Sequence, residues 1–403
     1  MSALIPVEEA LEQILAAAHP GPAVETVSLD QARGRVLAET VTSPLAVPGA
    51  DNSAVDGYAV HTDDLADTAT LPISQRIPAG QPAQPLTRGT AARIFTGAEV
   101  PAGANAVVMQ ENTEVSGDQV EIRQTVEAGQ NIRPRGQDLT EGAEVLRTGA
   151  RLRPQELGLL ASVGRAELSV YRRLRIAILT TGDELVDPGQ PLQPGQIYNT
   201  NRYTLKALIE SLGMEAVDCG DVADTAEATR EALEKAAQCD VIVTSGGVSV
   251  GEEDHVRAAI EQLGTLNLWR LAIKPGKPLA FGQVGDTPVI GLPGNPAAVF
   301  VTFQLVVRPF LLKTQGARHH ITAPGYWLPI RFEVAKANRR REFMRVRPEE
   351  LGGEVGLVAH PNQSSGILSS ACWAEGLAVI PENTTLKFGD LVQYLPFAEL
   401  QSQ

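Results

Sequence analysis

The chain has 403 residues, which at roughly 100–200 residues per domain predicts two to four domains. Hydrophobic residues make up 43% of it, enough to bury sizeable cores. Its formal net charge of −14 argues against nucleic acid and anionic membranes as partners, although a local group of cations can still bind a small anion.

The cysteines and the N-terminus both indicate a cytoplasmic protein. Cys219, Cys239 and Cys372 are widely spaced and form no Cys-x-x-Cys pair, so neither a disulfide framework nor a thiolate zinc site is expected. The N-terminal segment MSALIPVEEALEQIL lacks the basic start of a signal peptide. The uncharged stretch Thr287–Val307 is long enough to span a bilayer, but the turn Pro293–Pro296 divides it, so no membrane span is expected.

The first half of the chain combines helical and β patterns. Apolar residues recur at helical spacing from Val7 to Ala18, before the breaker Pro20-Gly21-Pro22. From about Val41 to Arg147 short β-rich runs alternate with turn pairs, which indicates a small inserted β domain. Residues Arg153–Gly164 return to helical spacing and end at a glycine.

From about Arg175 predicted strands and helices alternate. Apolar runs such as RIAIL and DVIVT are typical of buried strands, and helices are expected at Asn199–Gly213, from Asp224, at Glu252–Gly264 and at Pro296–Lys313. Asp224 is interpreted as a helix N-cap. This alternation predicts a parallel sheet with helices on both faces, and such sheets bind ligands beyond the carboxyl ends of their strands.

After about Arg318 the helical spacing disappears, and runs such as GLAVI predict a small β barrel or sandwich. The expected fold class is therefore multidomain α/β plus β. Four domains are predicted: a discontinuous helical and linking domain at 1–40 and 148–174, an inserted β-rich domain at 41–147, the α/β domain at 175–318 and a C-terminal β domain at 319–403.

The loops that follow the predicted strands carry the candidate chemistry. Thr181-Gly-Asp-Glu-Leu185 presents two acids at the mouth of the sheet. The paired glycines after Ser245 would form a concavity of backbone N–H groups suited to phosphate, although neither a Walker A nor a Gly-x-Gly-x-x-Gly pattern is present. Lys274-Pro-Gly-Lys-Pro278 holds two ammonium groups close together in an acidic chain, which indicates an anion receptor.

A different enzyme class is also open. Gly247-Val-Ser249-Val-Gly251 matches the Gly-x-Ser-x-Gly elbow, which makes Ser249 a nucleophile candidate, with Asp286 and one of His319, His320 or His360 as triad partners. The acidic run Glu252-Glu-Asp254 beside the serine would disfavour a developing oxyanion. Acids for a divalent cation, with lysines and glycine loops for phosphates, favour instead a phosphoryl- or nucleotidyl-type chemistry without naming its substrate.

Nine motifs in order give the chain a resemblance to a known family. They are DNSAVDGYA, RIFTGAEVPAGANAVV, RGQDLTEGAEVL, LTTGDEL, TSGGVSVGEED, IKPGKPLAFG, GLPGNPAAV, REFMRV and QSSGIL. This set resembles the MoeA family, the molybdopterin molybdenumtransferases, which are related to the E domain of gephyrin. The sequence departs from the family pattern at Asn105, where Asp is frequent, and at Arg340 and Arg341, where a Gly-His type of lead-in is expected.

The resemblance implies an activity, substrates and partners. Family members act on adenylylated molybdopterin and molybdate, cleave the link to AMP with the help of Mg²⁺, and form homodimers with shared active sites. Other proteins of molybdenum cofactor synthesis are implied as further partners. The gephyrin relationship also leaves open a non-catalytic scaffold.

The resemblance also implies roles for individual residues. The nucleotide–pterin cleft would use Thr181, Gly182, Glu184, Ser245, Gly246, Gly247, Ser249 and Asp254. Asp224 is placed with these cofactor-binding candidates, and Glu184 and Asp254 are the candidate Mg²⁺ ligands. Asp56, Thr96 and Asp138 would act in catalysis from the inserted domain of the partner subunit, and molybdate would lie near Lys274, Lys277, Arg345 and Ser365.

Overall fold

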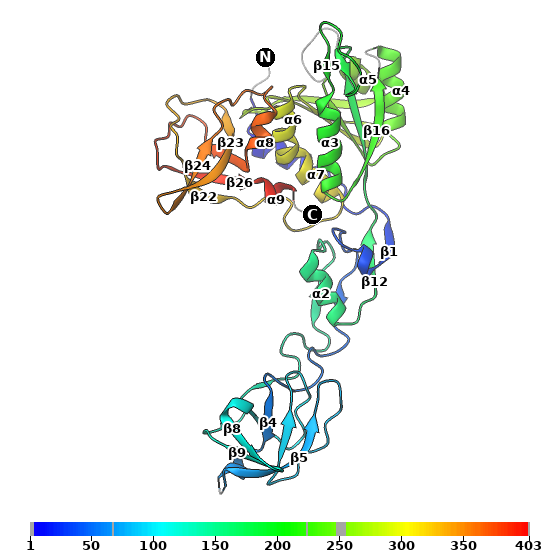
Figure 1. Cartoon of the computed structure of the whole chain (residues 1–403). Coiled ribbons are helices and arrows are strands. Elements are labelled where there is room, and N and C mark those ends of the chain that lie inside the picture. Colours follow the sequence, from blue (N-terminus) through cyan, green and yellow to red (C-terminus); the bar gives the residue numbers. More distant parts are fainter. Residues whose placement is uncertain (1–3, 67, 223–224, 247–254, 402–403) are drawn as a thin grey trace. The chain divides into compact units, whose positions relative to one another are not determined.

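The computed structural model describes residues 4–66, 68–222, 225–246 and 255–401 (Figure 1). These residues divide into two compact units. The first contains Met1–Glu39, Thr148–Pro154 and Glu167–Gln403, and the second contains Thr40–Arg147 and Gln155–Ala166. The inserted β-rich segment thus forms one unit together with Gln155–Ala166, and the division into four domains stays a prediction.

A six-stranded sheet forms the centre of the first unit, in the order β16-β13-β17-β21-β20-β18. Its strands are β13 (Arg175–Thr181), β16 (Glu215–Val222), β17 (Val241–Ser245), β18 (Gly264–Arg270), β20 (Pro278–Val284) and β21 (Thr287–Leu292). The first four in spatial order are parallel, as predicted, but β20 is antiparallel to both of its neighbours. The predicted parallel sheet is therefore mixed on one side, because a two-residue turn joins β20 to β21, and so short a connection cannot make a parallel crossover.

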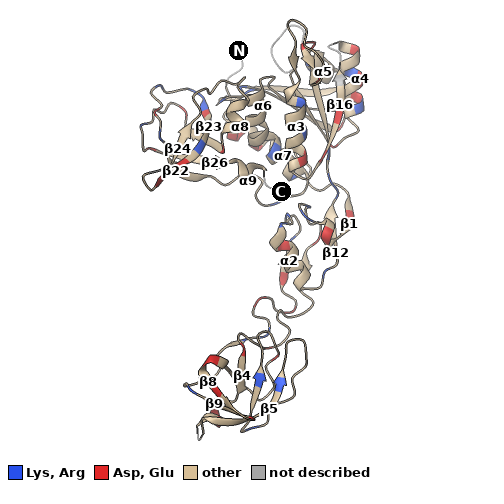
Figure 2. Ribbon diagram, viewed as in Figure 1, with Lys and Arg blue, Asp and Glu red and all other residues tan. Residues whose placement is uncertain are grey.

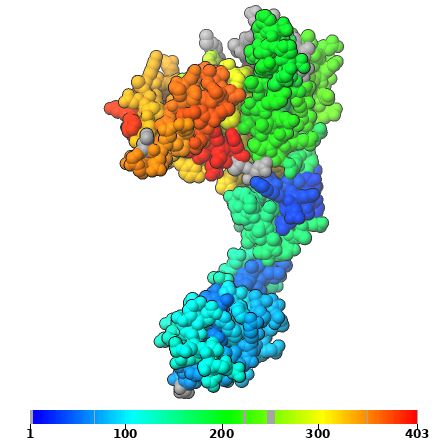
Figure 3. Space-filling view, viewed as in Figure 1, coloured from blue at the N-terminus to red at the C-terminus, as the bar shows by residue number. Residues whose placement is uncertain are grey.

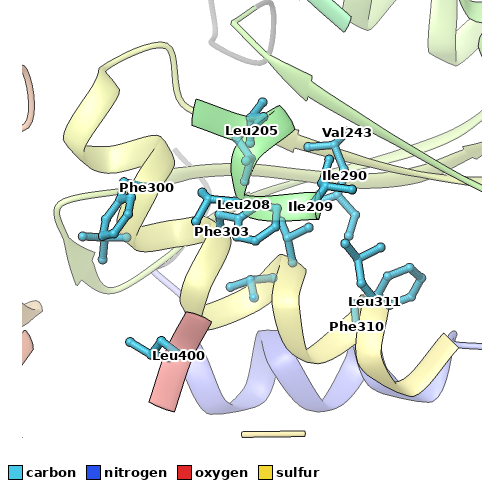
Figure 4. Close-up of a cluster of buried hydrophobic side chains, with 14 of the residues drawn as sticks. Leu205, Leu208, Ile209, Val243, Ile290, Phe300, Phe303, Phe310, Leu311 and Leu400 are labelled. Atoms are coloured by element: carbon cyan, nitrogen blue, oxygen red, sulfur yellow. The ribbon is translucent and has the colours of Figure 1, made fainter. Parts of the chain in front are cut away.

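Helices cover both faces of this sheet. They are α1 (Val7–Ala16), α3 (Thr200–Ser211), α4 (Ala226–Ala236), α5 (His255–Leu263) and a long helix made of α6 (Pro296–Thr302), a π-helical turn (Phe303–Val307) and α7 (Arg308–Thr314). Ile176 and Ile178 of β13 pack in the cluster that contains α1, α3 and the long helix, and the alternate residues Ala177 and Leu179 pack with α4 and α5. Figure 4 shows the first cluster, where Leu205, Leu208 and Ile209 meet Phe303. Alternate residues of a strand point to opposite faces, so the middle of this central strand, Ile176–Leu179, is continuously apolar.

The helix boundaries follow local signals. Asn199 is the N-cap of α3 and accepts a hydrogen bond from Arg202 N at 3.2 Å. The N-cap of α4 is Thr225, whose Oγ1 accepts from Ala228 N at 3.3 Å, so the assignment of that cap to Asp224 was wrong. Asp224 itself lies outside the described residues.

The stretch with membrane-like composition is part of this core. It consists of strand β21, a turn and the start of the long helix, as the proline-containing turn indicated. The helix Pro296–Thr314 is long and apolar enough to cross a membrane, but 83% of it is buried inside the protein.

The C-terminal strands continue the same unit. They are β22 (Tyr326–Pro329), β23 (Arg341–Leu351), β24 (Glu354–Ala359), β25 (Gly376–Ile380) and β26 (Leu391–Pro396), with helices α8 (Ser369–Trp373) and α9 (Phe397–Gln401). The bridge Ile330–Leu357 connects the end of β22 back to β24, which closes these strands into the predicted small barrel. The two-residue strand β19 (Ile273–Lys274) pairs with β23. Phe300 of α6 contacts Phe397 of α9 with a ring-centroid distance of 5.1 Å, and Figure 3 shows the orange and red C-terminal residues packed against the yellow and green part of the chain.

Short paired segments complete the first unit. Strand β1 (Val24–Ser28) pairs with β12 (Glu167–Tyr171), and β14 (Leu185–Val186) pairs with β15 (Ile197–Tyr198) in the loop after β13. A short 3₁₀ turn, Leu29–Gln31, follows β1.

The second unit is built on another six-stranded sheet, in the order β7-β4-β6-β5-β9-β8. Its strands are β4 (Gly57–Val60), β5 (Thr70–Ile77), β6 (Ala91–Ile94), β7 (Ala106–Met109), β8 (Thr113–Ser116) and β9 (Gln119–Ile122). The remaining elements are β2 (Val41–Thr42), β3 (Asn52–Ser53), β10 (Ile132–Arg133), β11 (Glu144–Leu146), α2 (Pro154–Ser162) and the 3₁₀ turns Thr62–Leu65 and Gln110–Asn112. Buried Ala, Val and Ile side chains cover both faces of this sheet, which confirms the predicted β-rich fold.

Candidate functional site

Five of the six strands of the central sheet, β13, β16, β17, β18 and β21, end at one edge. The register pairs Thr180 with Ser245 and Ser245 with Leu292, so β13, β17 and β21 end at the same level. Strand β18 runs in the same direction, because it is antiparallel to β20 and β20 is antiparallel to β21. The lysine loop that follows β18 therefore begins at the same carboxyl edge, where ligands of α/β sheets bind.

A cavity of about 510 Å³ lies among these loops. It is lined by Gly246, the lysine loop Lys274–Pro278, the turn Pro293–Asn295, Ala298, Arg340 and the segment Gln363–Ser365. Among the described residues, the charged ones in this lining are Lys274, Lys277 and Arg340, and none of them is a carboxylate. Three cations around one cavity, in a chain of net charge −14, make a site for a small anion. We call it the anion cavity.

The lysine loop is held in a fixed shape. Leu271 N donates to Lys277 O at 2.7 Å, which closes the loop. Gly276 has a φ of +106°, and a Cβ at this position would lie 2.2 Å from Thr302 Oγ1. Glycine is therefore required here by both the backbone conformation and the lack of space. This rigidity keeps the two ammonium groups close despite their mutual repulsion.

The two lysines differ in their surroundings. Lys274 Nζ donates to Glu342 Oε1 at 2.7 Å, an ion pair between the loop and β23. Within the described part of the chain no ion pair is found for Lys277, which is half-buried. Lys277 is thus the lysine whose charge is free to act on a ligand.

Arg345, which the resemblance places near molybdate, does not itself line the cavity, and its role there stays a prediction. It is 1% exposed, donating from Nε to Ser370 Oγ at 3.0 Å and from Nη2 to Ser364 O at 3.1 Å. Burial lowers the pKa of Arg345 to about 10. Because its guanidinium is directed to these oxygens, Arg345 supports the segment that carries Ser364 and Ser365 from behind, and Ser365 itself lines the cavity.

The cavity arginine is Arg340, at a position where the sequence departs from the family pattern. Its Nη1 donates to Ile273 O at 3.3 Å, and its backbone N–H donates to Asn338 Oδ1 at 3.0 Å. The first bond ties it to the start of the lysine loop, and the second is made within its own segment. The sequence alone did not indicate that Arg340 lines the cavity. The pairing of β19 with β23 that brings it there involves only Ile273 and Lys274, and so short a pairing leaves no periodic pattern in the sequence.

Asn201 links two of the loops and was also missed. Its Nδ2 donates to Ser245 Oγ at 2.8 Å and to Gly294 O at 2.7 Å, and Ser245 Oγ donates to Pro293 O at 3.2 Å. Its Oδ1 is buried and has no hydrogen-bond partner among the described residues. The residues Asn199-Thr-Asn201 predict only the start of a helix. A second Asn in the first turn of the helix is the local signal that could have indicated the linking role of Asn201.

The acidic loop after β13 lies beside the loop that follows β17. Gly182 has a φ of +148°, and a Cβ there would lie 2.5 Å from Glu184 Oε2; Glu184 is exposed. Gly246 has a φ of +88°, and its Cβ would lie 3.2 Å from Thr181 O. The structure thus brings Thr181, Gly182, Glu184 and Gly246 together. Gly247, Ser249 and Asp254 lie outside the described residues.

In the second unit, Asp56 and Thr96 form a pair. Asp56 Oδ1 accepts from Thr96 N at 2.7 Å and from Thr96 Oγ1 at 2.8 Å. These two hydrogen bonds, with the positive charge of Arg93, lower the pKa of Asp56. Asp138 is exposed in the loop after β10, where its backbone N–H donates to Val47 O at 2.9 Å.

The triad required by a serine hydrolase is not supported. Asp286 lies in the turn between β20 and β21, at the amino edge of the parallel strands. Ser249 follows β17, which ends at the carboxyl edge. Asp286 and the carboxyl end of β17 therefore lie at opposite edges of the sheet, and Ser249 itself lies outside the described residues.

Comparison with known proteins covers nearly the whole chain. Residues 5–164 match the MoeA N-terminal region (domain I and II), residues 177–313 match the probable molybdopterin binding domain, and residues 328–397 match the MoeA C-terminal region (domain IV). A molybdopterin molybdenumtransferase of Haemophilus influenzae is 44% identical over 80% of this chain and 80% of its own length. The chain belongs to the MoeA family.

Two further relatives agree with this assignment. A molybdopterin molybdenumtransferase of a Nostoc species is 39% identical over 90% of this chain and 86% of its own length. The crystal structure of the molybdopterin biosynthesis MoeA protein of Pyrococcus horikoshii is 31% identical and superimposes with a TM-score of 0.83, covering 98% of this chain and 100% of the other. The resemblance and the multidomain fold class are thereby confirmed, as is the prediction of a transferase. No comparison supports the serine hydrolase.

Proposed function

We propose that this chain inserts molybdenum into molybdopterin, taking molybdate and adenylylated molybdopterin and releasing AMP with the help of Mg²⁺. The observation that carries the proposal is the anion cavity, whose lining among the described residues contains three cations and no carboxylate, in an acidic protein. Molybdate is a small dianion, and such a ligand requires unpaired cations in a fixed arrangement. The names of the relatives supply the second support.

The role that we propose for each site residue follows from its position. Lys277 and Arg340 would bind the oxyanion directly, and Ser365 would add a hydroxyl at the same cavity. Lys274, Arg345 and Asn201 would position the loops through their hydrogen bonds. The backbone N–H groups around Gly246, with Thr181, would hold the phosphate end of the nucleotide–pterin substrate, because glycine-rich turns at strand ends present such donors.

The donor set fits a magnesium ion that arrives with the substrate. The described residues contain no group of three or more His, Cys, Asp or Glu side chains able to hold a metal alone. Mg²⁺ is usually held by one or two carboxylates together with substrate phosphates and water. The exposed carboxylate of Glu184 beside the glycine loops offers this kind of ligand, and Asp254 would be the second. When bound, Mg²⁺ would neutralise phosphate charge.

A direct test uses the free lysine. Replacing Lys277 by Ala should weaken molybdate binding at least tenfold in calorimetry and leave the melting temperature nearly unchanged, since a loop lysine contributes little to stability. Lys206→Ala, an exposed lysine of α3, is the matched control. Equal molybdate affinity in wild type and Lys277→Ala would remove this residue from the site and with it the main support for the proposal.

The shared active site is a separate part of the proposal. As the family resemblance implies, Asp56 of one subunit and Glu184 of the other would act in the same active site of a homodimer. In mixed dimers of Asp56→Ala and Glu184→Ala subunits, one site would carry both lesions and the other neither, so activity should return toward half. A mixture that stays inactive, with subunit exchange verified, would show that each subunit holds its own site.

The compartment also remains a proposal. The three cysteines are free thiols, which fits the reducing cytoplasm. Fractionation of cells that express the untagged protein would test this location.

A further inference from the structure

A second cleft lies next to the anion cavity. Its volume is about 860 Å³, and it is lined by Leu4, Arg270, Lys274, Lys277, the segment 336–340 and Glu342. Lys274, Lys277 and Arg340 line both the cleft and the cavity. The two spaces are therefore neighbours with a common wall of cations. We call the second one the basic cleft.

The basic cleft holds a large excess of positive charge. Of its described lining residues six are cations, namely Arg270, Lys274, Lys277, Lys336, Arg339 and Arg340, and one is an acid, Glu342, which is already paired with Lys274. For the other five cations the described residues provide no ion-pair partner. In a chain with 48 acidic and 34 basic residues, so many unpaired cations in one place destabilise the fold by repulsion. Such a cluster points to a function in which anions are attracted.

The part of the cleft near the cavity is built rigidly. Arg340 is held by Ile273 O at 3.3 Å and by Asn338 Oδ1 at 3.0 Å, and Asn338 O accepts from Asn383 N at 2.6 Å. Lys336 and Arg339 are exposed at the outer side, whereas Arg340 is half-buried. Figure 2 marks the arginines of β23, the strand that follows this segment, in blue. The positive charge thus extends from solvent to the cavity wall.

We propose that the basic cleft is an access funnel that captures small oxyanion dianions and delivers them to the anion cavity; this inference rests on the proposed function. Clefts lined by one sign of charge raise the association rate of oppositely charged ligands by about 10- to 1,000-fold, and the effect falls with ionic strength. Lys336 and Arg339 supply the long-range attraction. Lys277 and Arg340 line both the cleft and the cavity, so positive charge is continuous along the path of the anion.

The test reverses the charge at the outer side of the cleft. The variant Lys336→Glu/Arg339→Glu is compared with Lys206→Glu/Lys235→Glu, which changes net charge equally at exposed lysines of α3 and α4 that do not line the cleft. The kcat/KM for molybdate is measured between about 0.01 M and about 0.15 M ionic strength, over which the Debye length falls from about 30 Å to about 8 Å. We expect the cleft variant to lose about tenfold in kcat/KM at low ionic strength, with a flatter salt dependence and unchanged kcat. The control should follow the wild type.

Three outcomes would overturn the inference. The same kcat/KM and salt dependence in the cleft variant as in wild type would show that the cleft does not guide the anion. Equilibrium dialysis that finds two molybdate ions per wild-type chain and one in the variant would make the cleft a second static site instead. If wild type binds no molybdate in dialysis, the proposed function itself fails, and the access role fails with it.

Discussion

Lys274 Nζ lies 2.7 Å from Glu342 Oε1, and this ion pair joins the lysine loop of the α/β sheet to the start of β23. The two residues are 68 positions apart in the sequence. The pair explains why two lysines of one short loop are not equivalent. Lys274 is anchored by a carboxylate, whereas Lys277 and Arg340 provide the free charge of the anion cavity.

Removing the carboxylate should strengthen anion binding. In Glu342→Gln the charge of Lys274 becomes available to the cavity, so the Kd for molybdate should fall about three- to tenfold, which corresponds to roughly 1 kcal/mol. The side chain of Lys274 is 38% exposed, so the loss of the pair should change the free energy of unfolding by no more than about 1 kcal/mol. Titration calorimetry with molybdate measures the effect. The control is Glu349→Gln, which removes a carboxylate paired with Arg347 on the same strand; tighter binding in both variants would contradict a local cause.

Asn201 should act as the link between two loops of the site. Asn201→Ala loses the hydrogen bonds to Ser245 Oγ and Gly294 O and should lower the free energy of unfolding by about 1–3 kcal/mol. Asn201→Asp keeps the shape but cannot donate, so it should be at least as harmful. Denaturant unfolding gives these values. A double-mutant cycle with Ser245→Ala should be non-additive, and additive effects would show that the two side chains act independently.

The pH behaviour of Asp56 should depend on Thr96. The hydrogen bonds from Thr96 N and Oγ1 hold the pKa of Asp56 below its ordinary value of 3.8. Because the ionised form is favoured in the folded protein, the stabilising contribution is present above the unfolded pKa and is lost as pH falls through the lower folded pKa. Thr96→Val removes the hydroxyl and should raise the pKa of Asp56, measured by NMR titration of carboxyl-labelled aspartate. Thr113→Val, whose hydroxyl donates to Gln110 O, should leave it unchanged; an unshifted Asp56 in Thr96→Val would show that the Thr96 hydroxyl does not lower this pKa.

Gly182 and Gly189 offer a matched pair of substitutions near the magnesium candidate. Both have positive φ values, +148° and +100°, so alanine should cost about 1 kcal/mol or more of stability at each. A Cβ at Gly182 would also meet the carboxylate of Glu184 at 2.5 Å and must displace it, whereas a Cβ at Gly189 meets nothing within 4 Å. Gly182→Ala should therefore need a higher Mg²⁺ concentration for turnover than Gly189→Ala. The same Mg²⁺ dependence in both variants would separate Glu184 from the metal.

Much of the architecture and several site loops could be predicted from the sequence alone. The apolar runs RIAIL and DVIVT, each followed by glycine and polar residues, placed two strand ends correctly. Since parallel strands end at a common edge, this local pattern already brings Thr181, Gly182 and Gly246 together. The lysine loop was predicted as an anion receptor from its composition, and the acidic net charge of the chain made that interpretation stronger.

Only the tertiary structure decided which arginine faces the cavity. Arg340 and Arg345 lie in one basic run, and nothing in the residue pattern separates them. The choice depends on the pairing of Ile273 and Lys274 with the first residues of β23, a contact between distant segments that leaves no periodicity in either. The link from Asn201 to Ser245 and Gly294, and the antiparallel placement of β20, are decided in the same way. Local patterns report which face of a strand or helix is buried, whereas the side chain that reaches a ligand is selected by contacts between segments far apart in the chain.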